Sequence, residues 1–453
     1  MQFQLLTQPA PAGPLSKTDL MNRLTAFLLC FLAGITGAMA QTEVTIRDND
    51  NGTTESIDLP EGMTLNTDAL LKEWNAKKYL YPDTTCENPD YNPTFEPEVY
   101  KERLRRIPAV VELPYNNVVQ GFIDQYSGRL RRSVSYMLGA CNFYIPIFEE
   151  ALDYYGVPLE LKYLPVIESA LSPTAVSRAG AVGLWQFMLP TAKRYGLEVN
   201  SLVDERCDPL KSSYAAAHYL SDLYKIYGDW NLVIAAYNCG PTNINKAIHR
   251  AGGTKDYWAI YHYLPKETRG YVPAFIAANY IMNYYCEHNI CPMKATYPMA
   301  TDTLLLTRDV HFEQVAELCK VDMDALRALN PQYRTAIVPG SVEPSVLRLP
   351  LEAATAFIDL GDSIYTHRAG ELFTRRAEVE VKAPQAKRTA GKASRKSSSS
   401  RRSKSSRPRH VTIRKGDTLI DIAKRNGTTV SKLRKLNNLK GNSIRAGKTI
   451  RVR

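Results

Sequence analysis

The chain is poor in the residues from which metal centres are built. Its 453 residues include only seven histidines, and the sequence has no HExxH motif, no paired CxxC motif and no histidine cluster. Zinc sites depend on such spacings of histidine and cysteine. The sequence therefore gives a metal site little support, and we expect neither a metal nor a cofactor.

The sequence also lacks a run of apolar residues long enough to span a membrane, which takes about 20 residues. The apolar run 24–36 is shorter; it follows Met21-Asn22-Arg23 and precedes Ala38-Met39-Ala40. This order is typical of a secretory signal peptide, with an uncleaved anchor as the alternative. We expect residues 1–40 to be removed and the mature protein to be exported to the periplasm. Association with the outer membrane or the cell wall stays open.

Acidic side chains are scarce at the C-terminal end. From residue 387 onward the chain has 22 lysines and arginines and two acids, which gives this part a net charge of +20. The net charge of the whole chain is +11, so the part before residue 387 carries −9. This division argues against one uniformly basic nucleic-acid-binding domain, and we expect no nucleic-acid partner. Residues 385–409, rich in Ser, Arg and Lys, are predicted to be an unfolded linker. One interpretation of the linker is a solvated tether. The other is attraction to anionic wall or membrane surfaces, and the two are compatible.

Seven cysteines remain after removal of the signal peptide, so at least one thiol is unpaired. Export permits disulfides, but sequence spacing does not determine connectivity. Cys286 and Cys291 are close enough in sequence to be a plausible local pair. Burial of the cysteines as small apolar side chains is an equal alternative.

Apolar periodicity divides the mature chain into helical and mixed segments. Leu220, Leu223, Tyr224 and Tyr227 recur at helical spacing, and strand-like alternation is scarce across this part of the chain. Two shorter segments each have the order strand, helix, helix, strand, which indicates one βααβ module used twice. The predicted order is a signal peptide 1–40, a poorly structured lead-in 41–97, a mainly α domain 98–295, a βααβ module 300–350, a linker 385–409 and a second βααβ module 410–453.

A carboxyl group falls on the apolar side of a predicted helix. Leu164, Ile167 and Leu171 form an apolar stripe, and Glu168 lies four residues after Leu164 on that stripe. A carboxyl group facing the packed side loses solvent, which raises its pKa and lets it hold a proton near neutral pH. One interpretation is a general acid. The other is a structural glutamate at a helix end, bonded to nearby backbone.

Two further segments are weak signals when each is taken alone. Residues 177–188 are rich in glycine around Trp185 and Gln186, and glycine allows close backbone approach to a ligand. Residues 235–241 end a helix with Tyr237 and Asn238 beside a Gly-Pro break. Core packing and helix termination explain each of them equally well.

Taken together and in order, the motifs resemble a known enzyme family. They are Glu168-Ser169, Gly183-Leu184-Trp185-Gln186, Ala236-Tyr237-Asn238-Cys239-Gly240 and residues 267–273. Their succession is similar to that of the soluble lytic transglycosylases, which have a lysozyme-like helical fold. The flanks, including residues 106–108 and 112–115, resemble the membrane-bound D-type branch of these murein enzymes.

Both βααβ segments resemble LysM peptidoglycan-binding modules. The C-terminal one contains Lys415-Gly416-Asp417-Thr418-Leu419, whereas the segment 300–350 lacks the Gly-Asp-Thr entry and resembles a degenerate LysM. The predicted fold class is therefore a mainly α, lysozyme-like catalytic domain followed by small α+β LysM modules. In the C-terminal module the resemblance implies contacts to N-acetyl sugars through Gly416, Asp417, Thr418, Asn438 and Leu439. Gly416 and Asp417 equally suit a turn and a helix N-cap.

The resemblance implies a peptidoglycan lytic transglycosylase acting on glycan strands. Such an enzyme cleaves the β-1,4 bond between N-acetylmuramic acid and N-acetylglucosamine and leaves a 1,6-anhydro-muramoyl end. Glu168 would be the acid and then the base. The matching positions for substrate contacts are Ser177, Gln186, Tyr237, Asn238 and Tyr271. Trp185 and Cys239 depart from the residues common in the family.

The local sequence is consistent with a mechanism that uses one carboxylate. Most glycosidases need two acids, with substrate-assisted enzymes as an exception. Glu168 is the only acid within residues 161–197, although Asp204, Glu205 or Glu267 could supply a partner from a distance.

Three alternative functions remain. A hydrolytic muramidase of the same fold would leave reducing ends, and a second carboxylate near Glu168 would favour it. A non-catalytic peptidoglycan-binding protein would be expected to have lost Glu168 or the Tyr237-Asn238 pair, which this chain keeps. A Cys-His wall endopeptidase would need a reactive cysteine, and Cys239 lies in a motif better explained by sugar binding.

Overall fold

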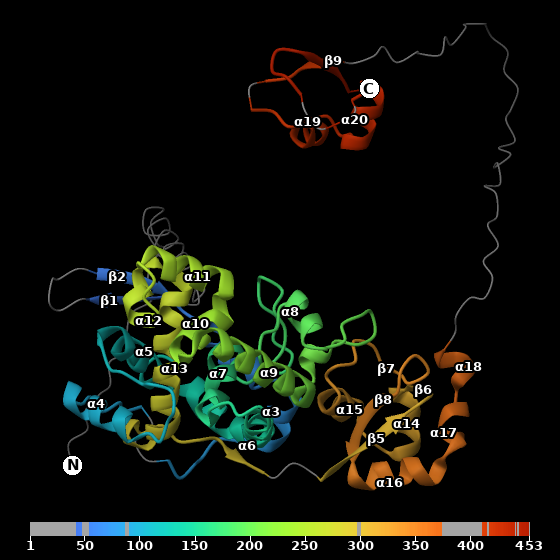
Figure 1. Cartoon of the computed structure of the whole chain (residues 1–453). Coiled ribbons are helices and arrows are strands. Elements are labelled where there is room, and N and C mark those ends of the chain that lie inside the picture. The colour runs from blue at the N-terminus through green and yellow to red at the C-terminus, as the bar shows by residue number, and fades with distance from the viewer. Residues whose placement is uncertain are drawn as a thin grey trace, which may run out of the picture. The chain divides into compact units, whose positions relative to one another are not determined.

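The computed structural model describes residues 42–47, 54–86, 90–296, 300–373, 410–414, 416–439, 441 and 444–452. The chain forms two compact units, residues 1–375 and residues 376–453 (Figure 1). The predicted signal peptide, 1–40, and the predicted linker, 385–409, lie outside the described residues.

The mainly helical domain that the sequence predicts is present between α4 and α13. α9 (Pro209–Tyr227) begins after Asp208, whose carboxylate accepts hydrogen bonds from two backbone amides, and ends at Gly228. Its predicted apolar stripe is buried except at Tyr224, whose ring stacks on Trp230 with centroids 4.2 Å apart. Other helices of this domain are α4 (Pro97–Arg106), α5 (Asn117–Ser127), α6 (Arg131–Tyr154), η2 (Leu159–Tyr163), α7 (Leu164–Ser169), α8 (Leu189–Arg194), η3 (Glu205–Cys207), α10 (Trp230–Cys239), α11 (Pro241–Arg250), α12 (Tyr257–Ile260), η4 (Tyr261–Tyr263), α13 (Lys266–Tyr284) and η5 (Cys286–His288).

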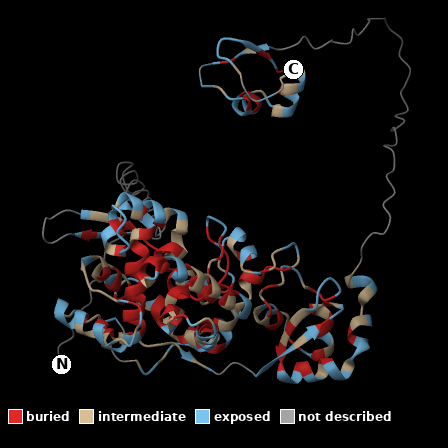
Figure 2. Ribbon diagram, viewed as in Figure 1, coloured by how far each residue is buried: buried red, intermediate tan, exposed pale blue. Residues whose placement is uncertain are grey.

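α13 lies at the centre of this domain. It is buried without interruption from Gly270 to Met282, and the buried residues in Figure 2 gather around it. A helix that is buried on all sides needs neighbours on all sides. α13 packs against α5, α7 and α10, so side chains on α13 and α7 are held close together.

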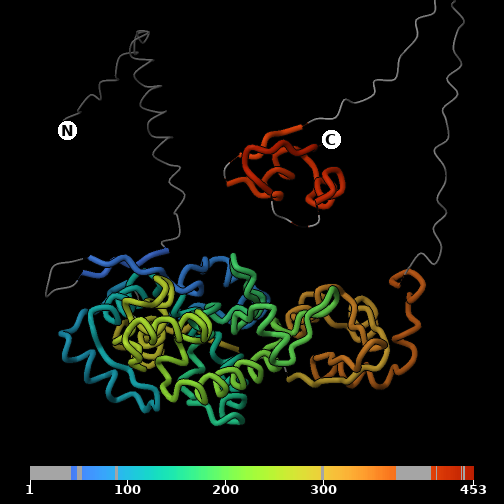
Figure 3. Tube along the Cα trace, turned by 45° about the horizontal axis from the view of Figure 1, so that its top comes forward, coloured from blue at the N-terminus to red at the C-terminus, as the bar shows by residue number. Residues whose placement is uncertain are grey.

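The segment before the helical domain is folded, which corrects the prediction of a poorly structured lead-in over 41–97. β1 (Glu43–Arg47) and β2 (Thr54–Asp58) form an antiparallel hairpin in which Val44 pairs with Ile57. The hairpin packs on α5 and α13 (Figure 3). Both paired side chains are buried, because distant helices supply the apolar surface that the segment itself lacks. The segment continues through η1 (Glu61–Thr64), α2 (Thr67–Leu70), α3 (Trp74–Tyr79) and β3 (Leu80–Tyr81).

A disulfide joins this segment to the end of the helical domain. Cys86 is bonded to Cys291, which lies 205 residues further along the chain, and β3 pairs with β4 (Lys294–Ala295) nearby. The predicted Cys286–Cys291 pair is therefore wrong: Cys286 is an exposed free thiol. A local spacing favoured that pair, but long-range packing brings residue 86 next to residue 291.

Residues 300–373 form a second hydrophobic core. β5 (Thr301–Leu306) pairs with β8 (Ser345–Pro350), and β6 (Asp309–His311) pairs with β7 (Ile337–Pro339). Between them lie α14 (Phe312–Cys319) and α15 (Met323–Leu329), the order that the sequence predicts. The core extends past the predicted boundary at 350, since Phe357 and Ile364 are buried in it. These residues belong to α16 (Leu351–Leu360) and α17 (Asp362–Thr366); α18 (Ala369–Leu372) follows.

A buried ion cluster fixes this module to the helical domain. The Asp204 carboxylate receives hydrogen bonds from Arg206 at 2.8 Å and from Arg334 of the module at 2.6 Å. Backbone hydrogen bonds from Asp204 to Gln332 and from Arg334 to Leu202 flank the cluster. The two modules of this unit therefore share a specific polar interface.

The C-terminal unit is a small βααβ fold. β9 (His410–Thr412) pairs with β10 (Thr449–Arg451) around α19 (Leu419–Arg425) and α20 (Val430–Leu436). Its core contains Ile422, Leu433 and Ile450. In the part of the chain that the structure describes, no helix has both the length and the apolar composition needed to cross a membrane.

Candidate active site

Six segments of the first unit line a cleft of about 390 Å³. They are η1, the end of α7 with the loop after it, α8, α9, the end of α10 and the start of α13. All six predicted catalytic and substrate-binding residues line it: Glu168, Ser177, Gln186, Tyr237, Asn238 and Tyr271. Their roles as acid or sugar contacts stay predictions.

α7 places Glu168 at this cleft. Leu164 and Ile167, which precede it on the predicted stripe, are fully buried. The helix ends one residue after Glu168, because Ala170 and Leu171 adopt left-handed conformations with φ of 47° and 63°. Leu171 is buried as predicted, but in this turn rather than on the helix. The early end leaves the Glu168 side chain half-buried at the cleft wall.

The surroundings of Glu168 favour its protonated form. Loss of solvent around the carboxyl group raises its pKa to about 8. The Tyr271 hydroxyl donates a hydrogen bond to Oε1 and works in the opposite direction. The negative charges of Glu267 and Glu61 raise the pKa further. At neutral pH the group is thus mostly protonated while standing in a solvent-accessible cleft, the state that a general acid requires.

α13 supplies the partner of Glu168 from the opposite wall. Tyr271 is buried, and burial raises the pKa of its phenol well above the ordinary value, so it remains a hydrogen-bond donor. The preceding residue, Gly270, lies against the β2 backbone, where an added Cβ would come within 2.7 Å of the Asp58 oxygen. The hairpin thus contacts α13 at Gly270, one residue before Tyr271, the hydrogen-bond partner of Glu168.

The glycine-rich loop 177–188 forms a third wall. The Ser177 hydroxyl accepts a hydrogen bond from the Ala181 amide at 2.9 Å, and Gln186 adopts a left-handed conformation. Its Nε2 donates to the Ala175 and Gly183 carbonyls at 3.2 and 2.8 Å. The side-chain nitrogen of Gln186 is thus occupied by hydrogen bonds that stabilise the loop. No hydrogen bond between Ser177 and Glu168 occurs among the described residues.

Tyr237 and Asn238 reach the cleft from the last turn of α10, which ends at Gly240. The Tyr237 hydroxyl donates to the Trp185 carbonyl at 2.8 Å. The Asn238 Oδ1 accepts from the Thr268 hydroxyl at 2.8 Å. Both side chains therefore also connect the walls of the cleft to one another.

One carboxylate of the cleft, Glu61, was not predicted from the sequence. Another, Glu267, was predicted only as a possible partner acid from a distant segment. Glu61 and Glu267 both line the cleft with Glu168. Glu61 belongs to the segment predicted to be unstructured, and its carboxylate accepts from the Arg178 amide at 3.3 Å. No local pattern marks Glu61, because its position depends on the packing of η1 against α7.

The predicted sugar-binding residues of the C-terminal module lie in two loops. Gly416, Asp417 and Thr418 precede α19, and Asn438 and Leu439 follow α20. Thr418 is the N-cap of α19 in a capping box, and Asp417 accepts from the Arg414 amide at 2.9 Å and pairs with Arg425. The turn predicted at Gly416 and Asp417 is present, whereas the N-cap is Thr418 and not one of those two residues.

A cysteine protease site is not formed around Cys239. Its thiol contacts the Gly240 carbonyl at 3.8 Å, burial raises its pKa, and the cleft lining contains no histidine. Across the described residues, no group of three or more His, Cys, Asp or Glu side chains is arranged to hold a metal ion.

Three family models match the chain. Residues 145–260 match the transglycosylase SLT domain, residues 300–366 match the LysM-like domain of lytic transglycosylase MltD, and residues 411–453 match the LysM domain. The first match covers most of the cleft lining and omits η1 and α13. The second ends at the last residue of α17, which agrees with the extended core.

Similar proteins include membrane-bound lytic murein transglycosylase D of Escherichia coli K12, 29% identical over 66% of this chain and 60% of that protein. The chain therefore spans about three fifths of the length of this relative. Peptidoglycan transglycosylase gp16 of Escherichia phage T7 is 34% identical over 26% of this chain and 9% of that protein. Among solved structures, the 70 kDa soluble lytic transglycosylase Slt70 of Escherichia coli is 28% identical over 34% of this chain and 26% of that chain, with a TM-score of 0.28.

Proposed function

Because this chain carries the transglycosylase SLT domain of the lytic murein transglycosylases, followed by MltD-type LysM-like and LysM domains, we propose that it is a peptidoglycan lytic transglycosylase. The bond cleaved is the β-1,4 bond between N-acetylmuramic acid and N-acetylglucosamine. The product is a 1,6-anhydro-muramoyl end.

The observation that carries this proposal is the environment of Glu168. Its carboxyl group is at the wall of an open cleft, has a pKa raised to about 8 and accepts a hydrogen bond from Tyr271. A general acid works best when its pKa lies near the working pH. Among the residues lining the cleft, Glu168 alone combines these properties.

The proposed reaction uses Glu168 twice. Its proton goes to the glycosidic oxygen as the bond from C1 of the muramoyl sugar breaks, and the N-acetylglucosamine leaves as an alcohol. The carbonyl oxygen of the substrate's own N-acetyl group stabilises the positive C1 atom. The Glu168 carboxylate then takes the proton of the C6 hydroxyl as O6 bonds to C1, which restores the acid form. No water enters the balance.

A hydrolytic muramidase is the second candidate, and a specific observation favours it. Glu61 and Glu267 line the same cleft as Glu168, so a second carboxylate is available in principle. In that mechanism one of them would activate a water molecule, and its removal would abolish cleavage. In the proposed mechanism both are dispensable for bond cleavage and mainly raise the pKa of Glu168.

The experiment is mass spectrometry of muropeptides released from purified peptidoglycan by the mature protein. We expect products lighter than hydrolysed muropeptides by one water, none with Glu168→Gln, and the same anhydro products with Glu61→Gln and Glu267→Gln. The two additional variants are matched controls, because each removes one carboxylate from the same cleft. Reducing ends that disappear with either control would establish the muramidase. Wall binding without release would leave a non-catalytic peptidoglycan-binding protein.

We further propose that the LysM modules hold the enzyme on glycan strands, through the two loops of the C-terminal module. A weak binding module on a tether raises the effective concentration of the enzyme at the wall. The basic linker would add a salt-sensitive attraction to anionic wall or membrane surfaces. The proposed location is the periplasm, which agrees with the membrane-bound, murein-directed description of the relative.

A further inference from the structure

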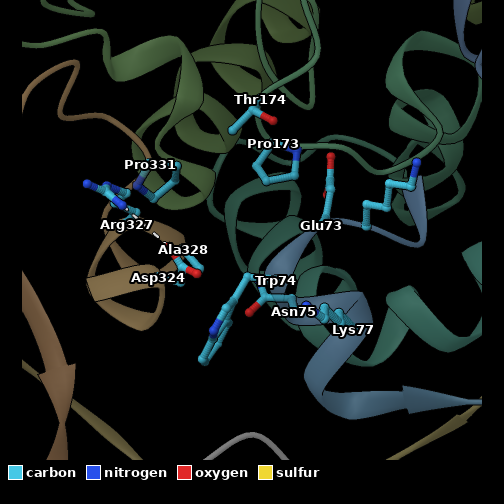
Figure 4. A pocket seen from close by; sticks show the side chains of 11 residues that line it. Glu73, Trp74, Asn75, Lys77, Pro173, Thr174, Asp324, Arg327, Ala328 and Pro331 are labelled. Atoms are coloured by element: carbon cyan, nitrogen blue, oxygen red, sulfur yellow. Dashed lines mark hydrogen bonds and ion pairs between the residues drawn. The ribbon is translucent and has the colours of Figure 1, made fainter. Parts of the chain in front are cut away.

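A second cavity, of about 360 Å³, lies between the N-terminal segment and the LysM-like module (Figure 4). On one side, Glu73 and Trp74 come from the start of α3; on the other, Asp324 and Arg327 come from α15. Pro173 and Thr174, from the loop after α7, complete it. Three segments far apart in the sequence therefore meet around this space.

The lining carries an excess of positive charge. Lys72, Lys77 and Arg327 contribute three cations. Only Arg327 has an acidic partner, Asp324 at 3.4 Å, and neither lysine forms an ion pair with a described residue. Burial raises the pKa of Glu73 to about 7, so this carboxyl group is only partly ionised near neutral pH and does not cancel the charges of the two lysines. A cavity with unpaired cations on an otherwise acidic body is suited to an anionic ligand.

The cavity is connected to the catalytic cleft by two stretches of chain. In the first, Glu168 and Ser177 line the cleft, whereas Pro173 and Thr174, between them, line the cavity. The second stretch is the N-terminal segment, which runs from Glu61 in the cleft to Lys72 and its neighbours in the cavity.

The chain that joins the two sites is short, which limits how far apart they lie. Six residue steps separate Glu168 from Thr174, so their Cα atoms are at most about 22 Å apart, and the left-handed turn at Ala170 and Leu171 shortens that distance. A hydrogen bond from the Ser172 hydroxyl to Glu73 joins the two stretches at the cavity.

We propose that this cavity binds the acidic stem peptide of the muramoyl residue whose glycan occupies the cleft. The inference rests on the proposed function and names a part of its substrate. A stem of four or five residues spans about 13–18 Å when extended, which is of the same order as the upper limit of about 22 Å set by the chain between Glu168 and Thr174. The stem peptide carries free carboxylates, which are opposite in charge to the lysine side chains of the cavity.

Other lining groups fit a peptide as well. Trp74 and Pro173 offer apolar contact, and the Asn75 amide and Thr174 hydroxyl offer hydrogen bonds to peptide groups. In its protonated form, which its pKa of about 7 makes accessible near neutral pH, the Glu73 carboxyl group adds a hydrogen-bond donor.

The direct test is binding of a synthetic tetrapeptide, L-Ala–γ-D-Glu–meso-diaminopimelate–D-Ala, to the mature protein by calorimetry. We expect saturable binding that weakens about tenfold in Lys72→Glu/Lys77→Glu. Arg327→Gln, on the opposite side of the cavity, should also weaken it. The matched control is Lys246→Glu/Lys255→Glu, which makes the same charge change at two exposed lysines that line neither site. Absence of binding, or equal weakening by the control, would overturn the proposal.

The second readout separates this proposal from the proposed function. The kcat/KM is compared on glycan strands that bear stems and on strands stripped of stems by an amidase. We expect Lys72→Glu/Lys77→Glu to lower kcat/KM about tenfold on the first substrate and to leave it unchanged on the second. Equal loss on both, or on neither, contradicts the stem-binding role. If the unaltered protein binds the tetrapeptide but cleaves neither substrate, the proposed function is wrong and the assignment of a peptide ligand to the cavity still holds.

Discussion

At the scale of single residues, the proposed catalysis depends on a carboxyl group that keeps its proton at neutral pH. Glu168 meets this condition through burial, with added repulsion from Glu267 and Glu61. The acid form is populated below the raised pKa of about 8 and is lost as the pH rises through it. Cleavage that starts with proton donation should therefore be sustained through neutral pH and fall above about pH 8.

The hydrogen bond from Tyr271 provides a specific test of this reasoning. The bond favours the charged carboxylate and so lowers the pKa of Glu168. In Tyr271→Phe that bond is lost, and the upper limb of the kcat/KM profile should move to higher pH, by up to about one unit. The measurement is a pH–rate profile on a soluble glycan, with Glu168→Gln as the blank. A shift to lower pH would contradict the assigned role of the bond.

At the scale of secondary-structure elements, the contact between η1 and α7 shapes the cleft. Gly62 lies so close to α7 that an added Cβ would be 2.7 Å from the carbonyl oxygens of Val166 and Ile167. Only a residue without a side chain fits there. The contact holds Glu61 in the cleft and supports the helix that carries Glu168.

We expect Gly62→Ala to separate the two elements. The clash should lower the free energy of unfolding by about 1–3 kcal/mol and reduce activity, since it displaces one wall of the cleft. The control is Gly370→Ala in α18, where an added Cβ meets no atom within 4 Å. Thermal unfolding of the two variants beside the unaltered protein gives the comparison. Equal stability of all three would show that the elements move apart at no cost.

The Cys86–Cys291 disulfide holds the same N-terminal segment from its other end. Cross-linking residues 205 positions apart restricts the unfolded chain strongly. Cys86→Ser/Cys291→Ser should therefore lose about 2–5 kcal/mol of stability, seen as a lower Tm that reducing agent no longer changes. Cys286→Ser, at an exposed free thiol, is the control and should behave as the unaltered protein. A reducing agent without effect on the unaltered protein would count against the bond.

The elements also show what the sequence can predict. Helices with a periodic stripe and clear end signals, such as α9 after Asp208, were predictable because those signals are local. The same holds for the βααβ order of both small modules. The six residues of the cleft were predicted from the family resemblance, five of them within the ordered motifs and Ser177 from its spacing to Glu168. The hairpin β1–β2, the position of Glu61 and the partner of Cys291 were not, because each depends on a surface formed by distant parts of the chain. The end of α7 before Leu171 was also missed, since no glycine marks the left-handed turn.

At the scale of the whole molecule, the chain combines a helical domain that matches the transglycosylase SLT model with two modules that match LysM-type models and differ in attachment. The LysM-like module is fixed to the helical domain through the Asp204–Arg206–Arg334 cluster. The C-terminal LysM belongs to a separate unit that begins at residue 376. Under the proposed function, the first module contributes one side of the proposed peptide cavity and the second retains the enzyme on the wall.

A chain that ends at residue 375 tests this division of roles. It should keep its kcat/KM on a short soluble glycan within about twofold and lose about tenfold or more of its rate on intact peptidoglycan sacculi. Repeating the assay at about 0.5 M salt separates glycan binding from attraction by the tail's net charge of +20. We expect the loss to persist at high salt. Equal rates of the full and shortened chains on sacculi would contradict a targeting role.

The central claim, that Glu168 directs an internal attack rather than hydrolysis, is tested most directly by digesting peptidoglycan in water enriched in ¹⁸O. Every new muramoyl end should carry no heavy oxygen, because the C6 hydroxyl of the sugar itself replaces the leaving group, and Glu168→Gln should yield no new ends. Incorporation of ¹⁸O at the anomeric carbon of the new ends would mean that water is the nucleophile, and a mechanism with Glu168 as the single acid and base of the cleft would be wrong.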